Sequence, residues 1–235
     1  MLKRLVMMSV AVMAAFCLHA ETETVNGIKW TYTVSNRKAS VGGGSSLYTA
    51  VPTSTSGAIT IPSELGGYPV TSIGSHAFSY CGSLTSVTIP DSVTSIGDNA
   101  FFNCSSLTSV TIPDSVTSIC DWGLSCCTSL QTIVVDEDNN NYKSIDGLLL
   151  SKDGKILVAC PGAKISVVIP DSVTSIGTSA FYCCDSLTSV MIPDSVASIG
   201  YYAFDGSSVT IPDSVTSIGS HAFNVCSSLS RFMIG

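Results

Sequence analysis

Apolar residues recur in a fixed pattern along most of the chain. In the copy that begins at Leu107, Val110 and Ile112 follow on the same face, and the hydroxyl side chains of Ser109 and Thr111 lie between them. An alternation with a period of two predicts a short β-strand that buries one face. A proline, which has no amide hydrogen to donate, then ends the strand. The Asp-Ser pair that follows predicts a turn, and Val-x-x-Ile predicts a second short extended segment.

The pattern repeats at intervals of 23 residues, from Leu84 to Leu107 and then to Leu130. A single copy cannot bury its own apolar face, so such copies are stable when they stack. Each copy then forms one rung, or coil, of the stack. The expected strand ends are Ile61, Ile89, Ile112, Val135, Ile169, Ile192, Ile211 and Ile234. The sequence therefore predicts a mainly β repeat solenoid with a parallel sheet.

Two further lines of residues define the predicted interior. An apolar spine contains Phe78, Phe101, Leu124, Phe181, Phe204 and Phe223. A cysteine line three residues later contains Cys81, Cys104, Cys127, Cys184 and Cys226. The Ala-Phe step before each cysteine predicts a short helical or 3-10 turn. Because identical residues in a line offer no unique pairing, we expect buried thiols, although Cys104 and Cys127 would lie within disulfide reach.

The first 20 residues have the three parts of a secretory signal peptide. Lys3 and Arg4 are basic, an apolar run extends to Leu18, and Ala20 is a small residue suited to cleavage. The apolar run is short for a membrane span. The sequence therefore predicts a protein that is secreted or displayed at the cell surface, with no transmembrane segment after cleavage.

Residues 21–57 predict a cap and loop that cover the first rung. Trp30 and Tyr32 alternate with Lys29 and Thr31, and the polar stretch 35–38 predicts the turn of a β-hairpin. Solenoids need such a cap because an open end exposes apolar core and an unpaired strand edge. Residues 58–235 then form the predicted repeat domain.

One unit of the repeat domain is longer than the others. Between Val135 and Ile169, the runs Leu148–Leu150 and Ile156–Ala159 flank a Lys-Asp-Gly-Lys turn. Asp-Gly between two apolar runs is a strong hairpin signal. We therefore expect a β-hairpin inserted into one rung at about residues 136–164.

The repeated segments resemble the BspA-type, or Treponema-type, leucine-rich repeat family. The resemblance rests on Leu-Thr-Ser-Val-Thr-Ile-Pro-Asp-Ser-Val-Thr-Ser-Ile-Gly-x-x-Ala-Phe-x-x-Cys, as at Leu84–Cys104, which recurs over roughly residues 58–235. It implies a leucine-rich-repeat superhelix outside the cell, with some members acting in adhesion or host-protein binding, and no shared catalytic residues. The chain departs from the pattern at Ile234-Gly235, which stop on a strand. End-to-end association through this uncapped C-terminal rung therefore stays open.

Composition and charge narrow the range of partners. The formal net charge is −7 at pH 7, and no Lys or Arg occurs between Lys38 and Lys143. Such an acidic surface repels phosphate backbones, so nucleic acid is not expected as a partner. The sequence contains no nucleotide-binding or hydrolase fingerprint, and we expect no cofactor.

Repetition along the stack explains the histidine and aspartate side chains that could otherwise be catalytic or metal-binding residues. His76 and His221 occupy the same position six rungs apart, about 29 Å at strand spacing, so they cannot share a metal or catalytic site. Acid–base catalysis needs two carboxyls in different environments. The aspartates after each proline are instead equivalent: Asp91, Asp114, Asp171, Asp194 and Asp213. Turn capping is their expected role, with weak divalent-cation binding as the alternative.

The outward surface of the strands remains as the candidate site. The candidate partner-binding residues are Ser86, Thr88, Ser109, Thr111, Thr132, Val134, Ser189, Met191, Ser208 and Thr210, with Tyr142, Lys152 and Lys155 from the insert. Solenoids commonly bind along an extended face. The sequence therefore predicts a non-catalytic protein that binds an unknown protein or glycan. Two alternatives stay open: a carbohydrate-active enzyme on a parallel β-helix, and a structural spacer or fragment of a larger surface protein.

Overall fold

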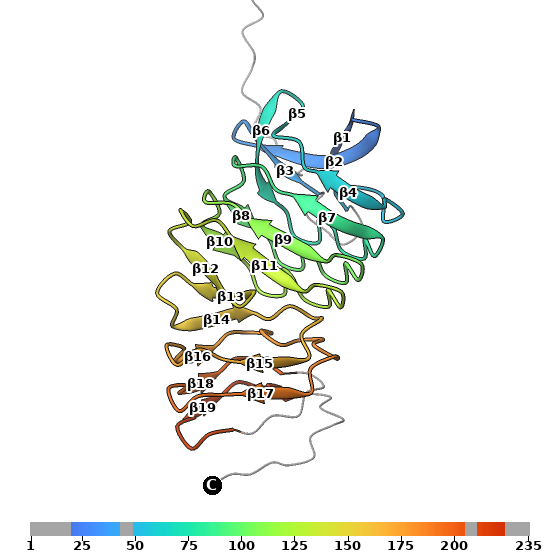
Figure 1. Cartoon of the computed structure of the whole chain (residues 1–235). Helices are drawn as coiled ribbons and strands as arrows, with labels where there is room; N and C mark the ends of the chain where they lie inside the picture. Colours follow the sequence, from blue (N-terminus) through green and yellow to red (C-terminus); the bar gives the residue numbers. More distant parts are fainter. Residues whose placement is uncertain (1–19, 43–48, 205–210, 224–235) are drawn as a thin grey trace, which may run out of the picture.

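The structure, a computed structural model, describes residues 20–42, 49–204 and 211–223. Within these ranges all regular elements are β-strands, which stack as rungs of a solenoid below an N-terminal cap (Figure 1). No helix in this part of the chain is long and apolar enough to cross a membrane. Apart from Ala20, the predicted signal peptide lies outside the described residues. Two ladders of parallel strands run along the solenoid.

The first ladder contains the strands of the Leu-x-x-Val-x-Ile segments. They are β4 (Gly57–Thr60), β7 (Leu84–Thr88), β9 (Ser109–Ile112), β11 (Thr132–Val135), β15 (Ser166–Val168) and β17 (Ser189–Met191). Val87 lies opposite Val110, and Val110 lies opposite Ile133, so each strand is displaced by one repeat. These three residues are buried, whereas Thr88 and Thr111 are exposed. The predicted alternation and the parallel sheet are confirmed.

The second ladder is formed by the Val-x-x-Ile segments and by one strand of the insert. Its strands are β6 (Tyr68–Ile73), β8 (Ser95–Ile96), β10 (Ser118–Ile119), β14 (Ile156–Ala159), β16 (Ser175–Ile176), β18 (Ser198–Ile199) and β19 (Ser217–Ile218). Apart from β6 and β14, each of these strands has two residues. The spacing of the second ladder matches that of the first, since Ile96 lies opposite Ile73 and Ile119 opposite Ile96.

A backbone bond from a valine and a side-chain bond from a serine stabilise the turn between the two ladders. Val116 N donates to the carbonyl of Pro113 at 3.3 Å, and the Ser115 hydroxyl donates to the Val93 carbonyl of the preceding rung at 2.7 Å. Asp114 in the same turn is exposed. In the described part of the chain, the five equivalent aspartate side chains accept no hydrogen bond. Turn capping by these aspartates, expected from the sequence, is therefore not what closes the turn.

An arc connects each second-ladder strand to the next first-ladder strand. In the arc from Gly74 to Cys81, alternate amides close turns, as Ala77 N does to the Gly74 carbonyl at 3.2 Å. The amides between them donate to the next rung, as Phe78 N does to the Ala100 carbonyl at 2.7 Å. A helix would direct all these amides along its own axis. Laterally bonded arcs thus replace the short helical or 3-10 turns that the sequence predicts.

Left-handed backbone recurs at two positions of the arcs. These positions lie two residues before and two residues after the spine residue. They are occupied by His76, Tyr80, Asn99, Asn103, Trp122, Cys126, Ser179, Cys183, Tyr202 and His221. Residues other than glycine adopt this conformation infrequently, and asparagine tolerates it well. The lateral hydrogen bonds between successive arcs stabilise it here.

The spine and the cysteine line form the predicted interior. The rings of Phe78 and Phe101 are stacked with centroids 5.1 Å apart, and those of Phe181 and Phe204 are 4.7 Å apart. The Cys104 thiol donates to the Phe78 carbonyl at 3.1 Å. The described members of the line are buried free thiols, as expected: Cys81, Cys104, Cys127 and Cys184. Cys226 lies outside the described residues.

Antiparallel strands cover the first rung. They are β1 (Glu21–Val25), β2 (Ile28–Ser35) and β3 (Lys38–Val41), while β5 (Glu64–Leu65) pairs with β6. Strand β3 pairs in parallel with β6, the first strand of the second ladder, so the cap extends that ladder by one strand. Trp30 on β2 is buried and meets Phe78 edge-on, with centroids 6.3 Å apart. The β2–β3 hairpin is the cap that the sequence predicts, and β1 is an additional strand.

The insert interrupts both ladders. It adds β12 (Tyr142–Ile145) and β13 (Leu148–Ser151), which form an antiparallel meander with β14. The sequence indicates the β13–β14 hairpin, whereas the β12–β13 hairpin over Asp146-Gly147 is an addition. Strand β14 pairs in parallel with β16, so it serves as the second-ladder strand of its rung. In the first ladder, β11 and β15 belong to different sheets.

The buried core divides at the same level into two clusters. Strands β9 and β11 above this level run at a different inclination from β15 and β17 below it (Figure 1). We call this junction, formed by β12–β14, the joint. The solenoid is thus two stacked halves that meet at the insert.

Candidate functional site

Candidate residues from neighbouring rungs meet in a groove on the first ladder. The groove encloses about 290 Å³, and its polar lining comes from Ser86, Thr88, Asp91, Ser109, Thr111 and Asp136. Hydroxyl groups donate and accept hydrogen bonds, and carboxylates accept them. Thr132 and Val134 lie on β11, the next strand of the same sheet. We call the outward side of β7, β9 and β11 the strand face.

Other candidates on the first ladder lie beyond the joint. Ser189 and Met191 are on β17, which pairs with β15 in a separate sheet. Met191 is 63% exposed, and Val168 opposite it is 66% exposed. Ser208 and Thr210 lie outside the described residues. The strand face is therefore shorter than the full strip indicated by the sequence.

The three candidates from the insert lie in or beside the sheet of the second ladder. The Tyr142 hydroxyl accepts a hydrogen bond from Ile119 N at 2.9 Å. The ammonium group of Lys152 donates to the Glu137 carbonyl at 3.1 Å. The backbone carbonyl of Lys155 accepts a bond from Thr174 N. The Tyr142 and Lys155 contacts connect the insert to neighbouring rungs, and the Lys152 contact lies within the insert. The structure does not bring the three residues to the strand face.

The histidines and carboxylates of the repeats show no shared site in the described residues. His76 Nδ1 lies 3.3 Å from the Ser79 hydroxyl, and the His221 ring stacks on Tyr202 with centroids 5.1 Å apart. The described part of the chain contains no group of three or more His, Cys, Asp or Glu placed to hold a metal ion.

A second site, which the sequence does not indicate, lies at the joint. Cys160 N donates to the Ala180 carbonyl at 2.7 Å, as the spine residues Phe78, Phe101, Phe181 and Phe204 donate to the equivalent carbonyl of the next rung. Cys160 therefore occupies a spine position, but the arc around it is shorter than the others. The following segment, Cys160–Ala163, packs against the preceding rung, where Ala163 N donates to the Leu130 carbonyl. We call this segment the short arc.

The arcs on either side of the short arc approach each other across it. Cys126 and Cys183 form a disulfide with their Cα atoms 4.8 Å apart. The Trp122 ring meets Tyr182 with centroids 4.4 Å apart and Tyr202 at 5.4 Å. The disulfide cysteines do not belong to the cysteine line. The sequence feature that could have indicated this pair is that Cys126 and Cys183 each directly precede a member of the cysteine line.

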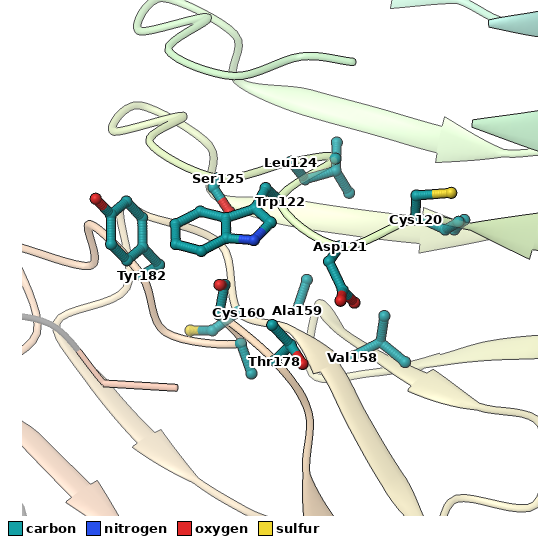
Figure 2. Close-up of a pocket in the computed structure, with 14 residues that line it drawn as sticks. Cys120, Asp121, Trp122, Leu124, Ser125, Val158, Ala159, Cys160, Thr178 and Tyr182 are labelled. Carbon is teal, nitrogen blue, oxygen red and sulfur yellow. The ribbon is translucent and has the colours of Figure 1, made fainter. Parts of the chain in front are cut away.

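A cleft surrounds Asp121 beside Trp122, and Figure 2 shows its lining from both halves of the solenoid. A part of about 370 Å³ lies between β10 and β14, and a cavity of about 30 Å³ continues beside Trp122 to Cys160. Burial and the neighbouring Asp98 carboxylate raise the pKa of Asp121, while the Thr178 hydroxyl opposes this effect. We call these spaces, which share Asp121 and Thr178 as lining residues, the joint cleft.

Comparisons with known proteins agree with this architecture. The sequence matches the BspA type leucine rich repeat region in six copies, over residues 58–151 and 161–235. No curated protein matches it. A solved structure of a leucine rich cell surface protein from Faecalibacterium prausnitzii A2-165 is 36% identical, with a TM-score of 0.55. That match covers 73% of this chain and 45% of the other, so the chain spans less than half of that protein.

Two further solved structures share the fold. A leucine-rich repeat protein from Eubacterium ventriosum is 24% identical over 86% of this chain and 68% of that one, with a TM-score of 0.51. The T. pallidum leucine rich repeat protein is 24% identical over 83% of this chain and 80% of that one, also with a TM-score of 0.51. The family match is interrupted between residues 151 and 161, where β14 and the start of the short arc lie. Repeats that match over most of its length show that the chain belongs to the BspA-type leucine-rich repeat family.

Proposed function

We propose that the chain is a non-catalytic recognition protein, secreted or displayed at the cell surface, that binds a partner protein or glycan along the strand face. The observation that carries the proposal is the groove of about 290 Å³. Four hydroxyl side chains from two rungs line it together. Parallel stacking places them side by side, so one partner can contact several rungs at once.

The charge of the groove favours some partners over others. Asp91 and Asp136 line it, and no Lys or Arg occurs between Lys38 and Lys143. An acidic groove attracts basic groups and repels phosphate or sulfate. Its hydroxyl groups match the hydroxyl and amide groups of sugars and peptides. A partner with basic, amide or hydroxyl groups therefore fits better than a polyanion.

Equivalent carboxylates support a binding role over an enzymatic one. The exposed aspartates after each proline share one environment, whereas acid–base catalysis needs two carboxyls with different pKa values. The predicted secretory signal peptide at residues 1–20 supports a location outside the cytoplasm. The F. prausnitzii protein, described as a cell surface protein, supports the same place. Release of sugars from a polysaccharide by the purified chain would contradict the non-catalytic part of the proposal.

The test is capture of a partner by the purified chain, followed by variants on opposite ladders. The immobilised chain is exposed to extracellular-matrix proteins and to a glycan library. Thr111→Tyr places a bulky ring in the groove and is expected to weaken binding at least tenfold. Thr94→Tyr is the matched control because Thr94 is also an exposed threonine and lies beside the other ladder. Equal binding by the two variants would overturn the strand face as the docking surface.

A further inference from the structure

The joint cleft has the size of a small-molecule site. Its part between β10 and β14 encloses about 370 Å³, and an open outer recess of about 400 Å³ lies beside Trp122. Ligand pockets in proteins commonly enclose about 300–1,000 Å³. Asp121 lines both spaces and the small cavity, so a ligand in either space can reach its carboxylate.

The lining of the cleft combines an apolar floor with a polar rim. Ile119, Tyr142 and Val158 contribute apolar surface, and all three pack against the core cluster of the N-terminal half. The rim carries the hydroxyls of Thr117, Ser151 and Thr178, the amide of Asn141 and the carboxylate of Asp121. No Lys, Arg or His lines any of the three spaces. The rim can therefore donate and accept hydrogen bonds, but it offers no positive charge.

Two oxygens around the cleft lack a hydrogen-bond partner. Ser179 lines the small cavity, is 6% exposed, and its hydroxyl has no partner. Oδ1 of Asp98, in the outer recess, is also buried without a partner. A buried polar group without a hydrogen bond costs about 1–3 kcal/mol. Both groups would gain a partner from a ligand that carries hydroxyl groups.

We propose that the joint cleft binds a neutral oligosaccharide. The C–H faces of a sugar ring suit the floor at Tyr142 and Val158. Its hydroxyl groups can donate to Asp121 and to the threonine oxygens of the rim, and they can accept from the Asn141 amide. An anion would be repelled by Asp98 and Asp121. An ammonium group donates hydrogen bonds without accepting them, and a metal ion does neither, so both would leave the Asn141 amide donor and the apolar floor unused.

Trp122 gives this site its own optical signal. The chain has two tryptophans, and the other, Trp30, is buried in the N-terminal cap at 1% exposure. Trp122 is partly exposed and lines two of the three spaces. A sugar in the cleft is therefore expected to change the emission of Trp122 and to leave that of Trp30 unchanged.

The experiment titrates the purified chain with cellotetraose, mannotetraose, galactotetraose and chitotetraose while tryptophan emission is recorded. At least one saccharide is expected to give a saturable change, and tetralysine or calcium chloride none. Asp121→Asn is expected to weaken the binding at least tenfold. Asp114→Asn, a matched change in an exposed turn away from the cleft, is expected to leave it within twofold.

Three results would overturn the proposal: no response to any of the four saccharides, equal affinities for the Asp121→Asn and Asp114→Asn variants, or saturable binding of tetralysine or calcium in place of sugar. Circular dichroism of each variant establishes that it folds. This site is separate from the strand face. The Thr111→Tyr variant is expected to lose the strand-face partner and to keep the saccharide response at Trp122. The two readouts therefore test the two proposals separately.

Discussion

Cys126 and Cys183 lie on arcs that are two rungs apart, yet their Cα atoms are 4.8 Å from each other. Adjacent strands of a sheet are about 4.8 Å apart, so two rungs would ordinarily separate equivalent residues by about 10 Å. The difference arises because the short arc, Cys160–Ala163, occupies less space than a full arc. The disulfide closes over it and joins the two halves of the core.

Removal of this disulfide is expected to destabilise the joint. The two cysteines are 57 residues apart in sequence, and a native cross-link of this kind typically contributes about 2–4 kcal/mol. The variant Cys126→Ser/Cys183→Ser should therefore unfold at lower urea concentration and lose the C-terminal half first. Cys120→Ser, at an exposed free thiol, is the control and should behave as wild type. An unchanged midpoint for the double variant would show that the joint does not depend on the disulfide.

Truncation of the spine should be more damaging than truncation of the ring beside it. Phe101 is fully buried and stacks on Phe78 with an interplanar angle of 5°. Phe101→Ala is expected to lower the free energy of unfolding by about 3–5 kcal/mol, because it leaves a cavity between rungs. Phe102 is partly exposed on the outside of the same arc, so Phe102→Ala should cost about 1 kcal/mol or less. Similar losses for the two variants in urea denaturation would contradict a stacked spine.

Gly97 is needed where two rungs approach closely. A Cβ atom at this position would lie 2.6 Å from Ser75 N and 2.8 Å from the Gly74 carbonyl carbon, which are backbone atoms. Gly97→Ala must therefore separate the rungs and should cost about 1–3 kcal/mol. Gly82→Ala is the control, since its nearest neighbour is the Ser105 hydroxyl at 3.1 Å. Thermal melting of both variants tests the difference, and equal melting temperatures would refute it.

The buried thiols should make the fold sensitive to alkali. Burial raises the pKa of Cys81 from its usual value near 9 to about 11. The folded state therefore holds this proton more tightly than the unfolded state, so stability is fully present below pH 9 and falls between about pH 9 and 11. Urea midpoints measured under anaerobic conditions at pH 7.5 and 10.5 should show the loss. Cys81→Ala should reduce it, and a variant with an undiminished loss would count against this cause.

The repeats could be predicted from the sequence because each rung copies the same buried positions. Val87, Val110 and Ile133 stack as the alternation requires, and the predicted strands and spine follow from that copying. The arcs could not be predicted in the same way. Ser-x-Ala-Phe is compatible with a helical turn in a single copy, and the left-handed residues such as His76 are stabilised by bonds to the next rung.

The joint cleft could not be predicted from the sequence because it depends on the short arc, which is shorter than the arcs of the other rungs. The sequence shows Cys126 and Cys183 beside the cysteine line, but it does not show that the chain shortens its path at Cys160. That shortening places Trp122 against Tyr182 and opens the space around Asp121. On the strand face, by contrast, Thr88 and Thr111 could be identified as outward residues from the alternation alone.

Site-specific photocrosslinking tests the proposed recognition surface most directly. A photoreactive benzoylphenylalanine is placed at Thr111 on the strand face or at Thr94 beside the second ladder, and each purified chain is irradiated with the same extracellular-matrix extract. Both threonines are exposed, so both probes can reach a partner in solution. A crosslinked partner is expected from position 111 and not from position 94. The same partner captured from position 94, with none from position 111, would contradict recognition along the strand face.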